Sequence, residues 1–83
     1  MSDQNKLAIL NSISSNAKPG IPTRLSFNVL SKTLNLSKEE LNTFLTELNR
    51  QRFISQYAKK GVDGFIVVIN QKGVDAVQDQ SLM

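Results

Sequence analysis

Apolar residues at the start of the chain recur at the spacing of an amphipathic helix. In residues 2–15, Leu7, Leu10 and Ile13 share one face, and polar side chains occupy the other. The segment 16–22 contains two prolines and one glycine, which prevent the helix from continuing. Ile21 within it could still make one short extended pairing. The pattern therefore predicts a first helix followed by a break.

Two capped helices are predicted between residues 26 and 50. Ser26 is a favourable N-cap, and Asn35 tolerates the left-handed conformation that ends a helix. Ser37 begins the second of the two helices, and Glu40 three residues later completes a capping box. An apolar stripe at i, i+3, i+4 and i+7 then follows: Leu41, Phe44, Leu45 and Leu48. Two helices separated by about three residues indicate a helix-turn-helix.

The pattern changes after Arg52, where β-branched and aromatic residues become dense. This pattern predicts a β-hairpin over residues 53–69. The chain is expected to reverse direction in Lys59–Gly64, a segment with two glycines. Residues 70–78 predict a short final helix capped by Asn70. The four phenylalanines are expected in the core: Phe27, Phe44, Phe53 and Phe65. The elements together predict an α+β domain.

The composition limits the chemistry open to such a domain. The 83 residues include neither cysteine nor histidine, which removes disulfides, thiolate nucleophiles, the commonest metal ligand and the commonest general base. The acidic residues, the lysines and the single tyrosine show no catalytic, metal-binding or phosphate-loop spacing. We therefore expect no enzyme activity, no metal site and no cofactor.

Charge and hydropathy bear on partners and location. Ten Lys and Arg against seven Asp and Glu give a net charge of +3, which suits a polyanionic partner without requiring one. The longest apolar run, Phe65–Ile69, is far shorter than the ~20 residues that span a membrane. The N-terminal residues also lack the pattern of a secretory signal. We expect a cytoplasmic protein without a membrane partner.

The order helix, helix-turn-helix, β-hairpin and short helix resembles the winged helix-turn-helix superfamily of DNA-binding regulators, over about residues 3–78. The segment Leu30–Ser37 is similar to the second helix and turn of that superfamily, where the usual pattern is Leu-Ala-x-x-Leu-Gly-Leu-Ser. Ser31 takes the small position and Asn35 takes the glycine position. Both replacements are mild, because serine is small and asparagine accepts the left-handed turn.

Two later segments extend the resemblance. Leu45–Ile54 is similar to the end of the recognition helix and the start of the first wing strand. Ile69–Val74 is similar to a Thr-x-x-Gly turn that follows the wing in several bacterial regulator families, with Asn70 in place of threonine. The resemblance implies one winged-helix domain over residues 1–83. It would have a three-helix core, a C-terminal β-hairpin wing and a short final helix.

The helix that begins after Ser37 presents a polar face opposite its apolar stripe. At ~100° per residue, Glu39, Thr43, Thr46 and Arg50 gather on this face, with Asn42 on one flank. These residue types match base edges: arginine suits guanine, asparagine adenine, threonine the thymine methyl group and glutamate cytosine N4. Phosphate contacts are expected from Lys38 at the start of this helix and from three residues around the preceding helix: Arg24, Ser26 and Lys32.

The same face also fits an ordinary solvated helix surface. Glu47 and Arg50 can form an i, i+3 ion pair, and Arg50 suits the negative end of the helix dipole. Glu39 lowers the positive potential where DNA would lie. The sequence is therefore compatible with a helix face that reads DNA bases and with one that only faces solvent.

The hairpin tip carries a second candidate contact. Lys59 and Lys60 precede Gly61, so the sequence places two cations on the loop, within reach of a phosphate or the minor groove. They fit equally well as lysines that protect an exposed strand edge from aggregation. Gly61 and Gly64 are interpreted as turn residues with positive φ, and Tyr57 is expected to be half-buried in a strand.

The function predicted from these features is sequence-specific binding of double-stranded DNA by a small transcriptional regulator. The alternative is a winged helix that binds another protein, which the weak net charge and Glu39 favour. A homodimer through the first and last helices fits the DNA-binding interpretation, because such modules commonly read two half-sites one turn apart. The sequence identifies no small-molecule effector and no operator.

Overall fold

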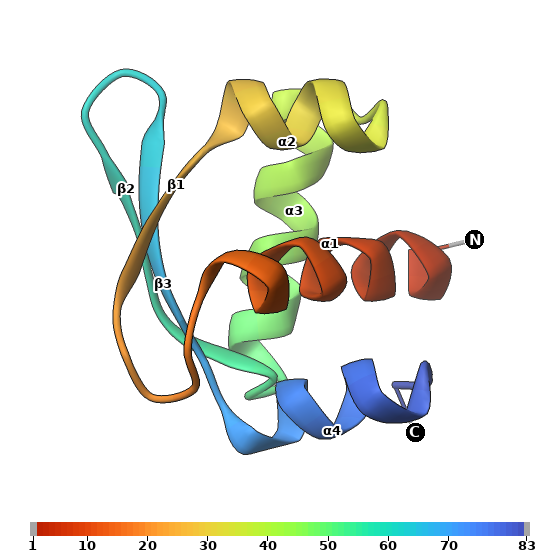
Figure 1. The fold of residues 1–83 in the computed structure, drawn as a ribbon. Coiled ribbons are helices and arrows are strands. Elements are labelled where there is room, and N and C mark those ends of the chain that lie inside the picture. The colour runs from red at the N-terminus through yellow and green to blue at the C-terminus, as the bar shows by residue number, and fades with distance from the viewer. Residues whose placement is uncertain (1, 83) are drawn as a thin grey trace.

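Residues 2–82 are described by the computed structural model, and within them the chain forms four helices and three strands (Figure 1). These are α1 (Ser2–Asn16), β1 (Thr23–Ser26), α2 (Phe27–Leu34), α3 (Lys38–Arg50), β2 (Ile54–Lys60), β3 (Gly64–Ile69) and α4 (Gln71–Asp79). The α+β class is confirmed. The ends of the predicted domain, Met1 and Met83, lie outside the described residues. None of the four helices is long and apolar enough to cross a membrane.

The three strands form one antiparallel sheet in the order β1-β3-β2, so β3 is central. The helices cover one face of this sheet (Figure 1). Side chains alternate along β3, and Phe65, Val67 and Ile69 are fully buried on the face that packs against the helices. Gly64 and Ile66 occupy the opposite, outer face. The sheet therefore has a core face and an outer face.

One hydrophobic core joins the helices to the sheet. Its helical members are Ile9, Leu10, Ile13, Phe27, Leu30, Leu41, Leu45 and Leu48. The rings of Phe27 and Phe65 lie 4.6 Å apart between centroids and connect α2 to β3. Burial of each such side chain contributes about 1.5–3 kcal/mol. Of the four phenylalanines expected in the core, three are buried there. Phe44 is only half-buried, because it lies at the margin of the apolar stripe of α3.

The predicted caps of α2 and α3 are confirmed. Ser26 Oγ accepts from the Val29 amide at 3.3 Å, and Asn35 ends α2 in the left-handed conformation with φ of 56°. Ser37 Oγ accepts from the Glu40 amide at 3.1 Å, while the Glu40 carboxylate accepts from the Ser37 amide at 3.0 Å. Three residues separate the helices, as the spacing predicts.

Two expectations about where elements begin were wrong. The short extended segment is Thr23–Ser26, and Ile21 lies outside it in an exposed bend. Asn70 occupies the N-cap position of α4 but makes no side-chain cap bond. The side-chain Nδ2 of Asn70 donates instead to the Arg52 carbonyl at 3.0 Å, and its Oδ1 accepts from Ser55 Oγ at 3.0 Å. These two bonds hold the start of β2 and the end of β3 together.

Glu47 also has a different partner from the one expected. Its carboxylate lies 2.8 Å from Lys6 Nζ of α1, whose side chain is almost fully buried. This ion pair, the single one in residues 2–82, leaves Arg50 without an acidic partner in that range. The charged end of Arg50 is therefore not used to hold the fold together.

Candidate nucleic-acid interface

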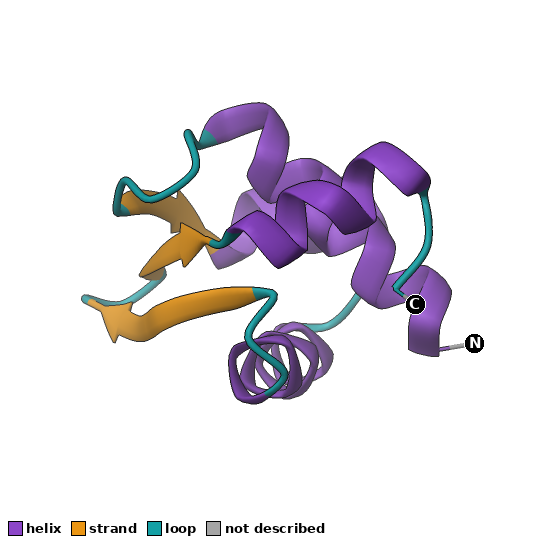
Figure 2. Cartoon of the chain, turned by 90° about the horizontal axis from the view of Figure 1, so that it is seen from below, coloured by secondary structure: helices purple, strands orange, loops and turns teal. Residues whose placement is uncertain are grey.

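Helix α3 lies at one side of the molecule. Figure 2 looks along its axis and shows no other described element beyond it on that side. Its exposed side chains there are Glu39, Thr43, Thr46 and Arg50, here called the α3 face. The structure thus places these four predicted residues together on open surface.

The polar side chains of the α3 face have few partners within the described chain. Thr46 Oγ1 donates to the Asn42 carbonyl one turn earlier at 2.8 Å, which leaves its lone pairs and methyl group available. Glu39, Thr43 and Arg50 make no side-chain hydrogen bond or ion pair with any residue in 2–82. Nothing in the described chain fixes where these three side chains point.

Asn42 differs from its neighbours because it faces strand β2. The Tyr57 hydroxyl donates to Asn42 Oδ1 at 2.7 Å, and the Tyr57 amide donates to Asn49 Oδ1 at 3.4 Å. Tyr57 is half-buried, as expected, and burial raises its pKa above the ordinary value of 10.0. Asn42 therefore holds α3 against β2, and its acceptor atom is already engaged.

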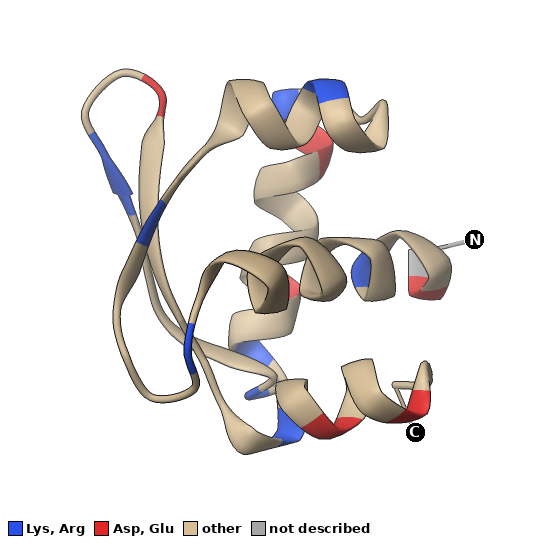
Figure 3. Cartoon of the chain, viewed as in Figure 1, with Lys and Arg blue, Asp and Glu red and all other residues tan. Residues whose placement is uncertain are grey.

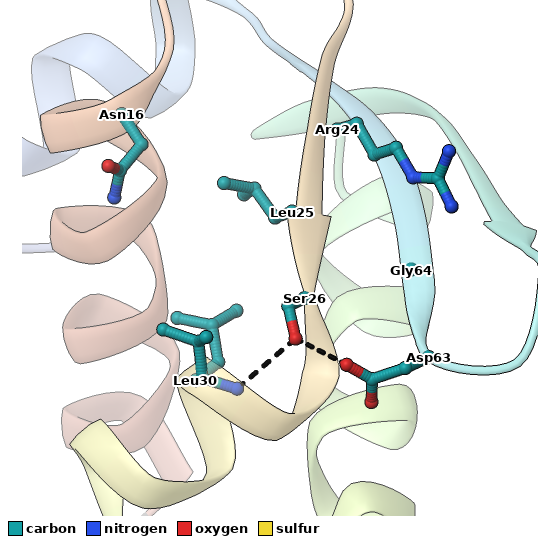
Figure 4. Close-up of a pocket in the computed structure, with 8 residues that line it drawn as sticks. Asn16, Arg24, Leu25, Ser26, Leu30, Asp63 and Gly64 are labelled. Carbon is teal, nitrogen blue, oxygen red and sulfur yellow. Dashed lines mark hydrogen bonds between the residues drawn. The ribbon is translucent and has the colours of Figure 1, made fainter.

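The turn of the hairpin, Gly61–Asp63, is attached to the starts of α2 and α3. The Asp63 carboxylate accepts from Ser26 Oγ (Figure 4). It also accepts from the Asn28 backbone amide, which lies 3.0 Å from its nearer oxygen. The Asp63 carbonyl accepts from the Phe27 amide at 2.9 Å. Asp63 is thus a second cap on α2, placed where the helix dipole favours a negative charge.

Lys38 completes this attachment from the other helix. Its Nζ donates to the Val62 carbonyl at 3.0 Å and lies 5.4 Å from the centroid of the Phe27 ring. Lys38 was predicted as a phosphate contact, and the structure gives it this structural role as well. The hairpin turn is consequently fixed beside the N-terminal end of α3.

Lys59 and Lys60 belong to the end of β2 rather than to the loop. Lys59 pairs with Phe65 and Lys60 with Gly64, so the two side chains lie on opposite faces of the sheet. The register shift between Ser55 and Ala58 decides which lysine takes which face, because an extra residue reverses the alternation beyond it. Lys59 therefore shares the core face with α3, and Lys60 lies on the outer face.

Arg24 shares the outer face with Lys60. It pairs with Ile66, and its guanidinium passes over Gly64, where a Cβ would lie only 2.8 Å from Arg24 Nε. Gly61 has the expected positive φ of 68°, whereas Gly64 does not, so close approach of Arg24 explains the second glycine. Figure 4 shows the Arg24 side chain extending from β1 beside Gly64.

Charges are distributed unevenly around α3 (Figure 3). A hollow of about 290 Å³ lies between the start of α3 and the hairpin, and it is lined by Phe27, Lys38, Glu39, Asn42 and Lys59. Two cations and one carboxylate meet there. Acidic residues mark the first turn of α3, and Arg50 lies in its last turn. The potential along α3 is therefore mixed.

A larger cavity of about 460 Å³ lies between the end of α1, the start of α2 and β1. Leu25, Val29 and Leu30 line it, with Asn16 at its α1 side (Figure 4). It contains no residue of the α3 face. Among the described residues, no three acidic side chains gather closely enough to hold a metal ion.

Ser26, one of the eleven predicted contact residues, caps α2 and is bonded to Asp63. The other ten fall into separate groups. The first group surrounds the α3–hairpin junction and continues along the α3 face: Lys38, Glu39, Asn42, Thr43, Thr46, Arg50 and Lys59. Arg24 and Lys60 lie on the outer face of the sheet, and Lys32 is exposed in the last turn of α2. Asp63 was missed as an organising residue, because its partners lie 35 and 37 positions earlier in the chain.

Comparisons with protein-family models, with curated proteins and with solved structures found no match.

Proposed function

We propose that this chain is a winged-helix domain that binds double-stranded DNA in a sequence-specific way, as a small transcriptional regulator. Helix α3 would enter the major groove, which admits one helix. The β2–β3 hairpin would be the wing and would contact the backbone at one end of α3. No catalytic step is part of this proposal.

The observation that carries the proposal is the open α3 face beside a fixed hairpin. Glu39, Thr43 and Arg50 have no partner in residues 2–82, so their hydrogen-bonding groups remain available to base edges. The hairpin turn lies against the start of the same helix through the bond from Lys38 to the Val62 carbonyl. A duplex along α3 would therefore meet Lys59 as well.

The dimensions of the α3 face agree with one half-site. From Glu39 to Arg50 the helix rises about 16 Å at ~1.5 Å per residue. That length corresponds to about five base pairs at ~3.4 Å each. Two copies would read two half-sites, and the exposed parts of α1 and α4 are the surfaces proposed for such a homodimer. Sedimentation of the free protein would test the dimer separately.

Binding of another protein is the second candidate, and Glu39 favours it. Its carboxylate is exposed at the centre of the junction and has no cation within ion-pair distance in residues 2–82. A carboxylate there repels phosphates but suits a basic or amide-rich partner. Recovery of a stoichiometric protein complex would favour this candidate.

Binding of labelled duplexes at two salt concentrations tests the proposal. Chosen and random sequences are titrated with protein, and the fluorescence anisotropy of the DNA is recorded. We expect affinity to fall steeply with salt for both sequences, because phosphate contacts release counterions. A preferred sequence should retain an advantage at both salt concentrations. Absence of binding at low salt, together with capture of a protein partner, would overturn it.

A further inference from the structure

The tip of the hairpin carries an apolar side chain that no other part of the described chain covers. Val62 is 93% exposed, the highest value among the large apolar residues that project into solvent. Its neighbours in the sequence are two lysines, two glycines and an aspartate. Turn chemistry favours Gly, Asn and Asp at such positions and gives a β-branched side chain no local advantage.

The turn that presents Val62 is held in place rather than free. Lys38 Nζ donates to the Val62 carbonyl at 3.0 Å, and the next residue, Asp63, is bonded to the start of α2. The backbone on both sides of the Val62 side chain is thus fixed while the side chain projects outward. A fixed apolar projection loses little conformational freedom when it enters a partner.

Cations accompany this projection on both faces of the hairpin. Lys59 lies on the α3 side and Lys60 on the outer side, and neither has an acidic partner in residues 2–82. In this arrangement the two lysines could contact the phosphates of DNA while the apolar tip enters the groove between them. Proteins that bend DNA place apolar wedges in the minor groove in this way, with cations on the flanking phosphates.

We propose that Val62 is an apolar wedge that enters the minor groove beside the sequence bound by α3 and bends the duplex there. This inference rests on the proposed DNA binding and adds a second, deforming contact to it. The bend would lie at the flank next to the N-terminal end of α3, because Lys38 fixes the tip at that end. Steps that unstack easily, such as TA and CA, would be favoured at that flank.

Fluorescence energy transfer between dyes at the two ends of a duplex of about 30 base pairs tests this inference. The duplex carries the sequence that wild-type protein selects from a random pool. We expect wild-type protein to bend it by an angle within about 20–90°. Val62→Ser should abolish most of the bend and weaken binding about tenfold, through lost apolar contact, while leaving the salt dependence unchanged. Val62→Leu keeps an apolar tip and should bend the duplex as wild type does.

Val29→Ser is the matched control, because Val29 is also an exposed valine, at 61%, and belongs to α2 rather than to the hairpin. It should change neither bend nor affinity. Tight binding by wild-type protein without a bend, or an unaltered bend with Val62→Ser, would overturn the wedge and leave DNA binding intact. If wild-type protein binds no duplex, both proposals fail. Loss of a protein complex on Val62→Ser would then assign the tip to that partner instead.

Discussion

The hairpin turn and the α3 face lie side by side, and their polar side chains behave in opposite ways. In the turn, the Asp63 carboxylate accepts from the start of α2 and the Val62 carbonyl accepts from Lys38 of α3. On the α3 face, Glu39, Thr43 and Arg50 have no such partners in the described chain. The first region holds the fold in shape, and the second offers groups to a ligand. Substitutions in the turn should therefore change stability, and substitutions on the α3 face should change binding.

The largest expected effect is on the stabilising side of this comparison. Asp63→Ala removes the acceptor of Ser26 Oγ and of the Asn28 amide, together with a favourable charge at the start of α2. We expect a loss of about 2–3 kcal/mol in the free energy of unfolding, seen as a lower urea midpoint with an unchanged slope. Asp75→Ala, which removes one exposed bond to Gln71, should cost less than about 0.5 kcal/mol. Equal effects would show that Asp63 does not anchor the hairpin.

Thr43 lies on the α3 face, so its substitution should change DNA binding and not stability. Thr43→Ala should leave the urea midpoint nearly unchanged, because the side chain has no partner in residues 2–82. Affinity for the preferred sequence should fall by about 1–3 kcal/mol, with no change on random DNA. Thr33→Ala is the control, since Thr33 is an exposed threonine on α2. A uniform loss on all sequences would contradict a base-reading role for Thr43.

Loss of the N-cap of α3 should lower the free energy of unfolding by less than the loss of Asp63. Ser37→Ala removes the side-chain acceptor of the Glu40 amide and half of the capping box. A decrease of about 1 kcal/mol in unfolding free energy is expected. Urea titration followed by circular dichroism measures it. An unchanged midpoint would mean that the first turn of α3 does not depend on this cap.

Lys59 and Lys60 are adjacent in sequence but lie on opposite faces of the sheet, so their substitutions should affect DNA binding differently. Lys59→Ala should reduce the slope of log affinity against log salt by about 0.9, the value for one lost phosphate contact. Lys60→Ala should reduce it by less, because its side chain lies on the face away from α3. A larger effect from Lys60 would place the DNA on the outer face of the sheet, beside Arg24.

The smallest effect is a pH dependence at Tyr57. Burial raises the pKa of this hydroxyl above 10.0 in the folded state, so the folded chain holds the proton more tightly than the unfolded chain. Stability from this source is present in full below pH 10 and is lost as pH rises through the folded pKa. Tyr57→Phe should remove that part of the alkaline loss. The chain has one tyrosine and no tryptophan, so ultraviolet absorbance follows Tyr57 alone. A Tyr57 pKa at or below 10.0 in the folded protein, measured by this absorbance, would contradict the effect of burial.

Local signals in the sequence were sufficient for much of the fold. The caps at Ser26 and Ser37 and the left-handed end at Asn35 depend on residues at most four positions apart, so the pattern predicts them directly. The strand Thr23–Ser26 was missed because it is four residues long and pairs with β3 about forty positions later. A strand of that length has too few positions to show alternation.

The candidate site was predictable only in part. The α3 face follows from helical geometry, and its four residues are exposed as expected. The faces of Lys59 and Lys60 depend on the irregularity between Ser55 and Ala58. Gln56 within it has a positive φ of 56°, which is uncommon for glutamine and gives no sequence signal. The role of Asp63 also needed the structure, since it rests on contacts with residues distant in sequence.

Selection of binding sites from a random pool of duplex DNA shows whether the α3 face reads base sequence. If the α3 face reads bases, wild-type protein should enrich one motif, with a half-site of about five base pairs. Thr43→Ala should weaken the preference at one position of that motif while other positions persist. A pool that remains unenriched after several rounds, at a salt concentration where the protein binds DNA, would contradict sequence-specific recognition by the α3 face.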